Sequence, residues 1–264
     1  MSDAEARVTP SPVSGRAAEP TRVAVLKEKI VSKPELAAPE VAANATLTRR
    51  SVLAAGGVLV ATGLVSRLLP GGLIGEALAA EPTADELLKA GELPDIVVGK
   101  ADAPVTIIEY ASLTCGHCAD FHTKVYPELK TKYIDTGKVR LILREFPLDN
   151  LAAAASMLVR CQEPAKAPEV ISTLFEKRRD WIVNGNPLPP LFATVKPLGF
   201  TQEVFDRCVA DQGMLQKIAA VRQRASQTFS VNSTPTFFIN GTRLKGTATM
   251  VELDKLIEPL LPKG

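Results

Sequence analysis

The stretch "TIIEYASLTCGHCADFHTKVYPELK", Thr106–Lys130, places two cysteines two residues apart, between an apolar run and a helical pattern. The β-branched run from Val105 to Tyr110 is typical of a buried strand. Three apolar residues after the motif recur at intervals of four and predict a helix: Phe121, Val125 and Leu129. The two cysteines are therefore expected where a strand gives way to the N-terminus of a helix.

The flanking sequence completes a strand, helix, strand unit. A short apolar strand is expected from Asp95 to Val98, and another from Lys138 to Phe146. Pro127 should kink the intervening helix, which ends at Gly137. A Cys-x-x-Cys pair in this setting indicates a thioredoxin-like redox motif.

The second half of the body turns helical and then returns to strands. Apolar spacing predicts helices around Leu158, from Ile171 to Trp181, around Phe205 and from Met214 to Phe229. "TPTFFINGTRLKG" then gives two short strands joined by Asn240-Gly241, which is a hairpin signal, and a last helix is expected from Met250 to Leu261.

This order predicts an α/β, thioredoxin-like fold with an all-helical insertion between the central strands. The expected parts are residues 80–149 and 231–264 for the thioredoxin-like body and residues 150–230 for the insertion.

Three chemistries could use the central cysteine pair. A zinc site needs four ligands, commonly from a second Cys or His pair, and the two histidines are His117, inside the motif, and His122, one turn further. No second ligand pair is present, so we expect no metal. A purely structural bridge across so short a loop gains little chain entropy. Redox chemistry is the favoured interpretation.

Cys115 is expected to be the reactive thiol. A cysteine at a helix N-terminus faces unpaired N–H groups and the positive end of the helix dipole, which favour the thiolate. The neighbouring His117 can add a hydrogen bond or a positive charge. Cys118 would then be the resolving partner in exchange through a mixed disulfide, and the Gly116-His117 dipeptide favours an oxidant over a reductant.

"EYASLTCGHCADFH", "STPTFFING" and the helical insertion between them together resemble the DsbA-type thiol:disulfide oxidoreductases of the thioredoxin fold, over about residues 90 to 262. The resemblance implies that Cys115 and Cys118 are the redox pair. It also implies that Thr234-Pro235 is the cis-proline loop that faces the sulfurs and holds substrate, and that Glu109 is a buried acid that relays the proton of Cys118. The best-known members carry valine at the position of Thr234 and Pro-His between the cysteines.

The implied activity is an oxidase that needs no cofactor and donates its disulfide to reduced exported proteins. A membrane quinone-linked protein would reoxidise it. An isomerase or reductase of the same fold usually needs a dimerisation extension, and residues 80–94 look too short for one, so a monomer is expected. A redox-inactive peptide-binding chaperone is the third alternative, and the intact cysteine pair argues against it.

Residues 1–79 read as an export leader. They hold 9 Lys/Arg against 7 Asp/Glu, whereas residues 80–264 hold 22 of each, a balance that argues against nucleic-acid binding. Arg49-Arg50, an apolar run from Val52 to Val65 and a small-residue cleavage site ending at Ala79 follow in order. This arrangement resembles a twin-arginine signal and predicts a periplasmic protein cleaved near Ala79.

Two cysteines remain in the helical insertion. Cys161 and Cys208 both lie on apolar helical faces, so they are expected to form a second, non-catalytic disulfide. The alternative is two buried free thiols that act as small apolar side chains. Among single residues, Trp181 is expected in the core, His122 on a solvated helix surface, and Glu109 either buried behind Cys118 or exposed on an edge strand.

Overall fold

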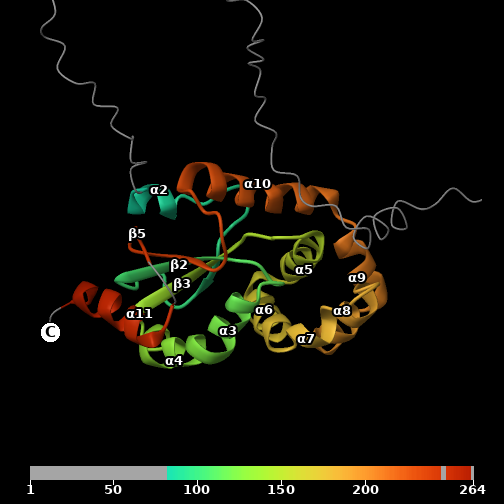
Figure 1. Cartoon of the computed structure of the whole chain (residues 1–264), viewed down its shortest axis with the longest axis horizontal. Coiled ribbons are helices and arrows are strands. Elements are labelled where there is room, and N and C mark those ends of the chain that lie inside the picture. The colour runs from blue at the N-terminus through green and yellow to red at the C-terminus, as the bar shows by residue number, and fades with distance from the viewer. Residues whose placement is uncertain (1–81, 245–247, 263–264) are drawn as a thin grey trace, which may run out of the picture.

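The computed structural model describes residues 82–244 and 248–262 (Figure 1). The expected leader, with Arg49-Arg50 and the cleavage site near Ala79, lies outside these residues. The described part contains one mixed sheet enclosed by helices, and its strands run in the order β1-β3-β2-β4-β5. This is the expected thioredoxin-like architecture, confirmed with its helical insertion.

The strands lie close to the bounds that the sequence predicts. They are β1 (Ile96–Val98), β2 (Val105–Ala111), β3 (Val139–Glu145), β4 (Thr236–Ile239) and β5 (Thr242–Arg243). β2 and β3 are parallel, and the other pairs are antiparallel. In this register Glu109 of β2 lies between Leu143 of β3 and Phe237 of β4.

Strand alternation separates two cores. Ile108, Tyr110, Ile142 and Phe238 pack with Leu87 of α2 (Ala84–Leu88) and with α10 (Gln212–Phe229). The opposite face includes Ile107, Leu141, Leu143 and Phe237 and packs against the helices after the cysteine motif and against α11 (Met250–Ile257). Figure 1 shows α2 and α10 on one side of the sheet, and α3, α4 and α11 on the other. Glu109 shares its face with Ile107, because the two are separated by one residue.

The helix after the cysteine motif is irregular. It begins as α3 (Gly116–Asp120), widens into the π turn η1 (Phe121–Val125), tightens to α4 (Tyr126–Leu129) and widens again at η2 (Lys130–Ile134). Pro127 lies in the first turn of α4, where a missing N–H has the smallest effect. Instead of a single kink at the proline, the helix has a π turn on each side of the segment that contains it.

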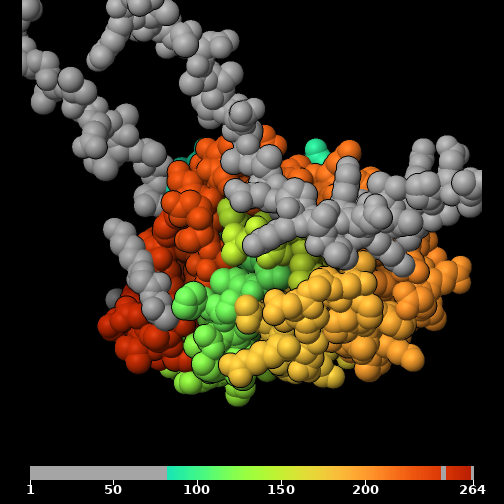
Figure 2. All heavy atoms as spheres, turned by 45° about the vertical axis from the view of Figure 1, so that its right-hand side comes forward, coloured from blue at the N-terminus to red at the C-terminus, as the bar shows by residue number. Residues whose placement is uncertain are grey.

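The secondary structure between β3 and β4 is all helical. It contains α5 (Asn150–Arg160), α6 (Ala167–Glu176), α7 (Arg178–Trp181), α8 (Leu188–Val195), α9 (Gln202–Val209) and α10, with short 3-10 turns at Pro164–Lys166 and Lys196–Leu198. The helix expected from Ile171 to Trp181 is two helices, α6 and α7. Trp181 is fully buried, and its Nε1 donates to the Leu174 carbonyl at 2.8 Å. In Figure 2 the insertion, in yellow and orange, forms a block beside the green segment of the cysteine motif.

The turn between β4 and β5 follows the sequence signal. Asn240 and Gly241 have φ values of 43° and 93°, and two positive φ values are what a type I′ hairpin requires. After α11 a 3-10 turn, Glu258–Leu260, completes the expected last helix. Within residues 82–244 and 248–262, none of the helices combines the length and the apolar character needed to cross a membrane.

Candidate functional site

Cys115 and Cys118 lie at the start of α3, and neither is bonded to another cysteine. Cys115 is the N-cap residue with extended backbone, and it is partly exposed. Cys118 is one turn inside the helix and fully buried. The two sulfurs of one short motif therefore meet very different environments.

These environments move the two thiol pKa values apart. The pKa of Cys115 is lowered to about 5, chiefly by a hydrogen bond from the Cys118 thiol. Burial opposes this change, whereas hydrogen bonds from Thr234 and from the backbone amides of Cys118 and His117 add to it. Burial raises the pKa of Cys118, and its hydrogen bond to Cys115 and the charge of Glu109 raise it further. At neutral pH Cys115 is a thiolate and Cys118 a thiol. His117 is exposed, and it acts on Cys115 through its backbone amide.

The Thr234-Pro235 peptide bond is cis and lies beside the cysteines. In its protonated form the Cys115 thiol donates to the Thr234 carbonyl at 3.3 Å, although 119 residues separate the two in the chain. A groove of about 390 Å³ opens next to them and is lined by residues from α3, η1, β4 and the segment before α11, among them His117, Phe121, Val125, Pro235 and Phe237. The lining combines these apolar side chains with the charged Asp120 and Lys124, and an extended polypeptide could approach Cys115 along the groove.

Arg178 of α7 holds the turn that leads into the motif. Its Nε and Nη2 both donate to the Thr114 carbonyl, at 2.9 and 2.7 Å. The Thr114 hydroxyl donates to Asp149 Oδ2 at 2.8 Å. A Cβ added to Gly116 would lie 4.0 Å from the guanidinium carbon, so Arg178 also packs over the motif itself. The sequence predicts a helix from Ile171 to Trp181 but not this contact of Arg178, because α7 meets the motif only in the folded chain.

Glu109 is fully buried on β2, and the edge-strand alternative is thereby excluded. Its Oε2 lies 2.9 Å from Nε2 of His122. The expectation that His122 lies on a solvated surface is wrong, since only 3% of its side chain is exposed. It lies in η1, directly after Phe121, and both side chains are buried. One sequence signal would have placed it correctly: His122 follows Cys118 by four residues, which is one helical turn along the buried face.

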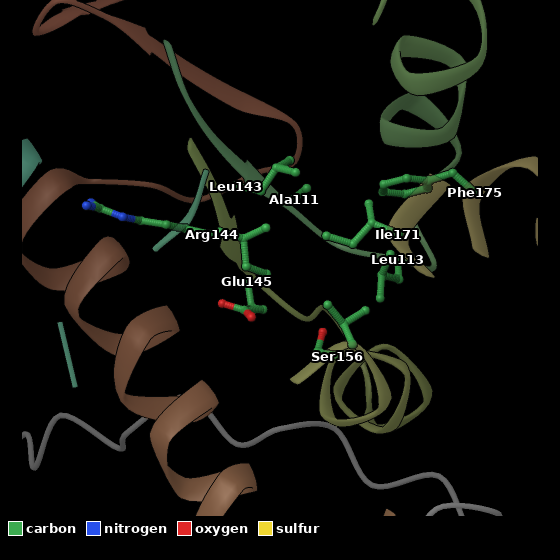
Figure 3. A pocket seen from close by; sticks show the side chains of 10 residues that line it. Ala111, Leu113, Leu143, Arg144, Glu145, Ser156, Ile171 and Phe175 are labelled. Atoms are coloured by element: carbon green, nitrogen blue, oxygen red, sulfur yellow. The ribbon is translucent and has the colours of Figure 1, made fainter. Parts of the chain in front are cut away.

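The surroundings of Glu109 have low polarity. A cavity of about 30 Å³ lies close by and is lined by Ala111, which follows Glu109 on the same face of β2, by Leu143, and by Ile171 and Phe175 of α6. In Figure 3 these side chains face one another across the space between the sheet and α6, with Ser156 of α5 at its lower end. A carboxyl group here has little solvent to stabilise a charge.

Cys161, at the end of α5, forms a disulfide with Cys208 of α9. Their Cα atoms are 5.9 Å apart, and the bridge closes 47 residues of chain. Cys208 is buried, whereas Cys161 is exposed. Neither residue is a free thiol in this structure. In the part of the chain that the structure describes, no group of three or more His, Cys, Asp or Glu side chains could hold a metal ion.

Comparison with known proteins gives a consistent result. A thioredoxin family model, Thioredoxin_4, matches residues 92–259. The crystal structure of alpha-DsbA1 from Wolbachia pipientis is 32% identical, covers 67% of this chain and 96% of its own, and superposes with a TM-score of 0.62.

Two sequence relatives agree with the structural match. A proposed protein-disulfide oxidoreductase of Rickettsia bellii is 32% identical over 169 residues, which are 62% of this chain and 65% of the relative. Disulfide bond formation protein D of Bacillus subtilis is 27% identical over 61% of this chain and 75% of the relative. The chain thus spans just under two thirds of the length of the Rickettsia bellii protein.

Proposed function

Because the chain belongs to the DsbA-like protein-disulfide oxidoreductases of the thioredoxin fold, we propose that it introduces disulfides into exported proteins through Cys115 and Cys118. The observation that carries this proposal is the contrast between the two sulfurs. Cys115 is accessible and its pKa is lowered to about 5, whereas Cys118 is buried and its pKa is raised. A stabilised Cys115 thiolate favours the reduced enzyme, so the enzyme's disulfide is readily given away.

The exchange follows from this contrast. A client thiolate attacks Cys115 Sγ, the Cys115–Cys118 bond breaks, and Cys118 leaves as a thiolate that takes up a proton from the Glu109 side of the site. A second client thiolate then attacks the client sulfur of the mixed disulfide. Cys115 departs as a thiolate, and its low pKa makes it a good leaving group. The products are a client disulfide and the reduced enzyme.

The groove beside Pro235 is the proposed client site. Its lining offers apolar contacts from η1 and β4 beside polar groups of α3 and η1, which suits unfolded segments of varied sequence, and the backbone of Thr234 lies within hydrogen-bond distance of Cys115. We assign client binding to Thr234 and Pro235 and redox chemistry to the cysteine pair, with His117 and Glu109 modulating the two sulfurs.

The proposed setting is the periplasm. The Arg49-Arg50 signal with a cleavage site near Ala79 supports twin-arginine export, and disulfides such as Cys161–Cys208 persist in oxidising compartments. We propose that the enzyme acts as a monomer and that a membrane quinone-linked protein reoxidises it.

The test is oxidation of a reduced dithiol peptide by the purified oxidised protein. One equivalent of enzyme should convert one equivalent of peptide, and Cys115→Ser should abolish the reaction. The Cys161→Ala/Cys208→Ala variant is the control, because it removes the two cysteines outside the motif and should retain the reaction. A wild-type protein that reduces insulin but leaves the peptide reduced would indicate a reductase and overturn the proposal.

A further inference from the structure

The hydrogen bond between Glu109 and His122 joins two titratable side chains that are both shielded from solvent. They come from different elements, β2 and η1, and 0% and 3% of their side chains are exposed. Two of their polar atoms, Glu109 Oε1 and His122 Nδ1, have no hydrogen-bond partner among the described residues. Buried polar groups are nearly always satisfied, so two unsatisfied atoms on one bonded pair indicate more than packing.

The pair is enclosed mainly by apolar groups. Leu143 and Phe237 flank Glu109 on the neighbouring strands. The imidazole stacks on Phe175 of α6, with ring centroids 4.3 Å apart and an interplanar angle of 18°. Phe121 meets it edge-on at 5.3 Å.

Two titratable groups adjoin this pair. Cys118 of α3 is close enough to Glu109 for the carboxylate charge to raise the pKa of the thiol. Tyr126 of α4 lies with its ring 5.3 Å from the imidazole; burial raises its pKa, and the charges of Asp135 and Glu109 raise it further. A lone carboxylate in this environment would be costly, whereas a carboxyl and an imidazole that share one proton are neutral together.

We propose that His122 is a positioning residue for proton transfer at Cys118: it holds Glu109 by one oxygen and shares a proton with it. The inference rests on the proposed dithiol exchange and adds the residue that makes Glu109 an effective proton carrier. Glu109 Oε1, which the imidazole leaves free, is the atom available for exchange with Cys118.

The proton balance follows the exchange reaction. When a client opens the Cys115–Cys118 disulfide, Cys118 leaves with the bonding electron pair as a thiolate. The shared proton then moves to Cys118 Sγ, and the Glu109–His122 pair is left with one negative charge. During reoxidation the Cys118 thiol returns its proton to the pair, and its thiolate attacks the mixed disulfide at Cys115. Because the pair is neutral until it gives up its proton, Glu109 and Cys118 do not both carry a full negative charge at the same time.

Reaction of the reduced protein with oxidised glutathione separates the relevant step. In the first phase Cys115 forms a mixed disulfide at a rate proportional to glutathione concentration. In the second phase Cys118 resolves it at a rate independent of that concentration. Acid quenching followed by mass spectrometry measures both phases between pH 5 and 8.

Two substitutions separate the roles of the imidazole. His122→Phe keeps a ring against Phe175 but removes the hydrogen bond, and His122→Gln keeps a donor to Glu109 but cannot carry a proton. We expect both to slow the second phase roughly 100-fold at pH 7, the lower end of the usual range for general acid–base catalysis, and to leave the first phase unchanged. The matched control is Phe175→Leu, which removes the stacked ring and keeps the pair.

The pH profile distinguishes proton transfer from loss of packing. Without the pair, hydroxide must deprotonate Cys118, so the second-phase rate of both His122 variants should rise close to tenfold per pH unit. The wild type and Phe175→Leu should show a shallower slope. Glu109→Gln should match the His122 variants, and the double variant Glu109→Gln/His122→Phe should be no slower than either single variant. Unchanged slopes, or slowing that multiplies in the double variant, would overturn the inference.

If these variants do not fold, a measurement on the wild-type protein can still test the inference. The ¹⁵N chemical shifts of the His122 ring should differ between the oxidised and reduced protein between pH 5 and 8, because the proton of the pair moves to Cys118 on reduction. Identical shifts in both states would overturn the inference. A wild type that shows no second phase would instead overturn the proposed exchange chemistry, so the two failures are distinguishable.

Discussion

Replacing Cys118 by alanine tests how one sulfur controls the other. The hydrogen bond from Cys118 is the largest contribution to the lowering of the pKa of Cys115 to about 5. A hydrogen bond to a charged group is worth roughly 1.5–3 kcal/mol, which corresponds to about 1–2 pKa units. We therefore expect Cys115 to titrate about 1–2 units higher in Cys118→Ala. It should still titrate below an unperturbed thiol, because Thr234 and the backbone amides remain.

Cys118→Ser is the matched control, since its hydroxyl can still donate to Cys115. Its midpoint should lie between those of the wild type and the alanine variant. Ultraviolet absorbance of the thiolate against pH measures all three, and with Cys161 and Cys208 bridged both variants have Cys115 as their one free thiol. Equal midpoints in the wild type and Cys118→Ala, or a wild-type midpoint near the unperturbed ~8.5, would refute the reasoning.

Three further predictions concern stability and export. The pKa of Cys115 is about 5 in the folded reduced protein and about 8.5 in the unfolded chain. The thiolate therefore adds to the free energy of unfolding fully above about pH 8.5, and this contribution is lost as the pH falls through about 5. Denaturant titrations of the reduced protein that show no such loss would contradict this. Cys161→Ala/Cys208→Ala should lower the free energy of unfolding by roughly 3–4 kcal/mol, as measured by urea titration. Alkylation of Cys115 checks that the reactive thiol is still intact in this variant, and an unchanged urea midpoint would show that the bridge adds no stability. Replacing Arg49 and Arg50 by lysine should block export, and unchanged processing in a cell fractionation experiment would exclude the twin-arginine route.

Local patterns predicted much of the fold. The β-branched run before the motif placed β2 to within one residue, and Asn240-Gly241 identified the hairpin because few residues adopt positive φ readily. The change from strand periodicity to helix periodicity at the motif placed Cys115 at a helix N-terminus. These features depend on neighbours in the chain.

The spacing of His122 from Cys118 indicated its burial, but the other missed features depend on the folded chain. The π turn at Phe121–Val125 is not encoded by a regular apolar spacing, and it accommodates His122 beside Phe121 on the buried face. The contact of Arg178 with Thr114 crosses 64 residues and requires α7 to pack against the motif. Periodicity also joined α6 and α7 into one helix, whereas the backbone turns at Lys177, where ψ is 18°.

The reduction potential of the Cys115–Cys118 couple tests the central claim most directly. A thiol with a pKa of about 5 is roughly 100-fold more ionised than protonated at pH 7, which stabilises the reduced enzyme by about 2.7 kcal/mol, or about 60 mV for two electrons. Equilibration with glutathione buffers, followed by alkylation and mass spectrometry, gives the potential. We expect a value at least about 60 mV above the about −270 mV of thioredoxin, and a value near about −270 mV would contradict an oxidase.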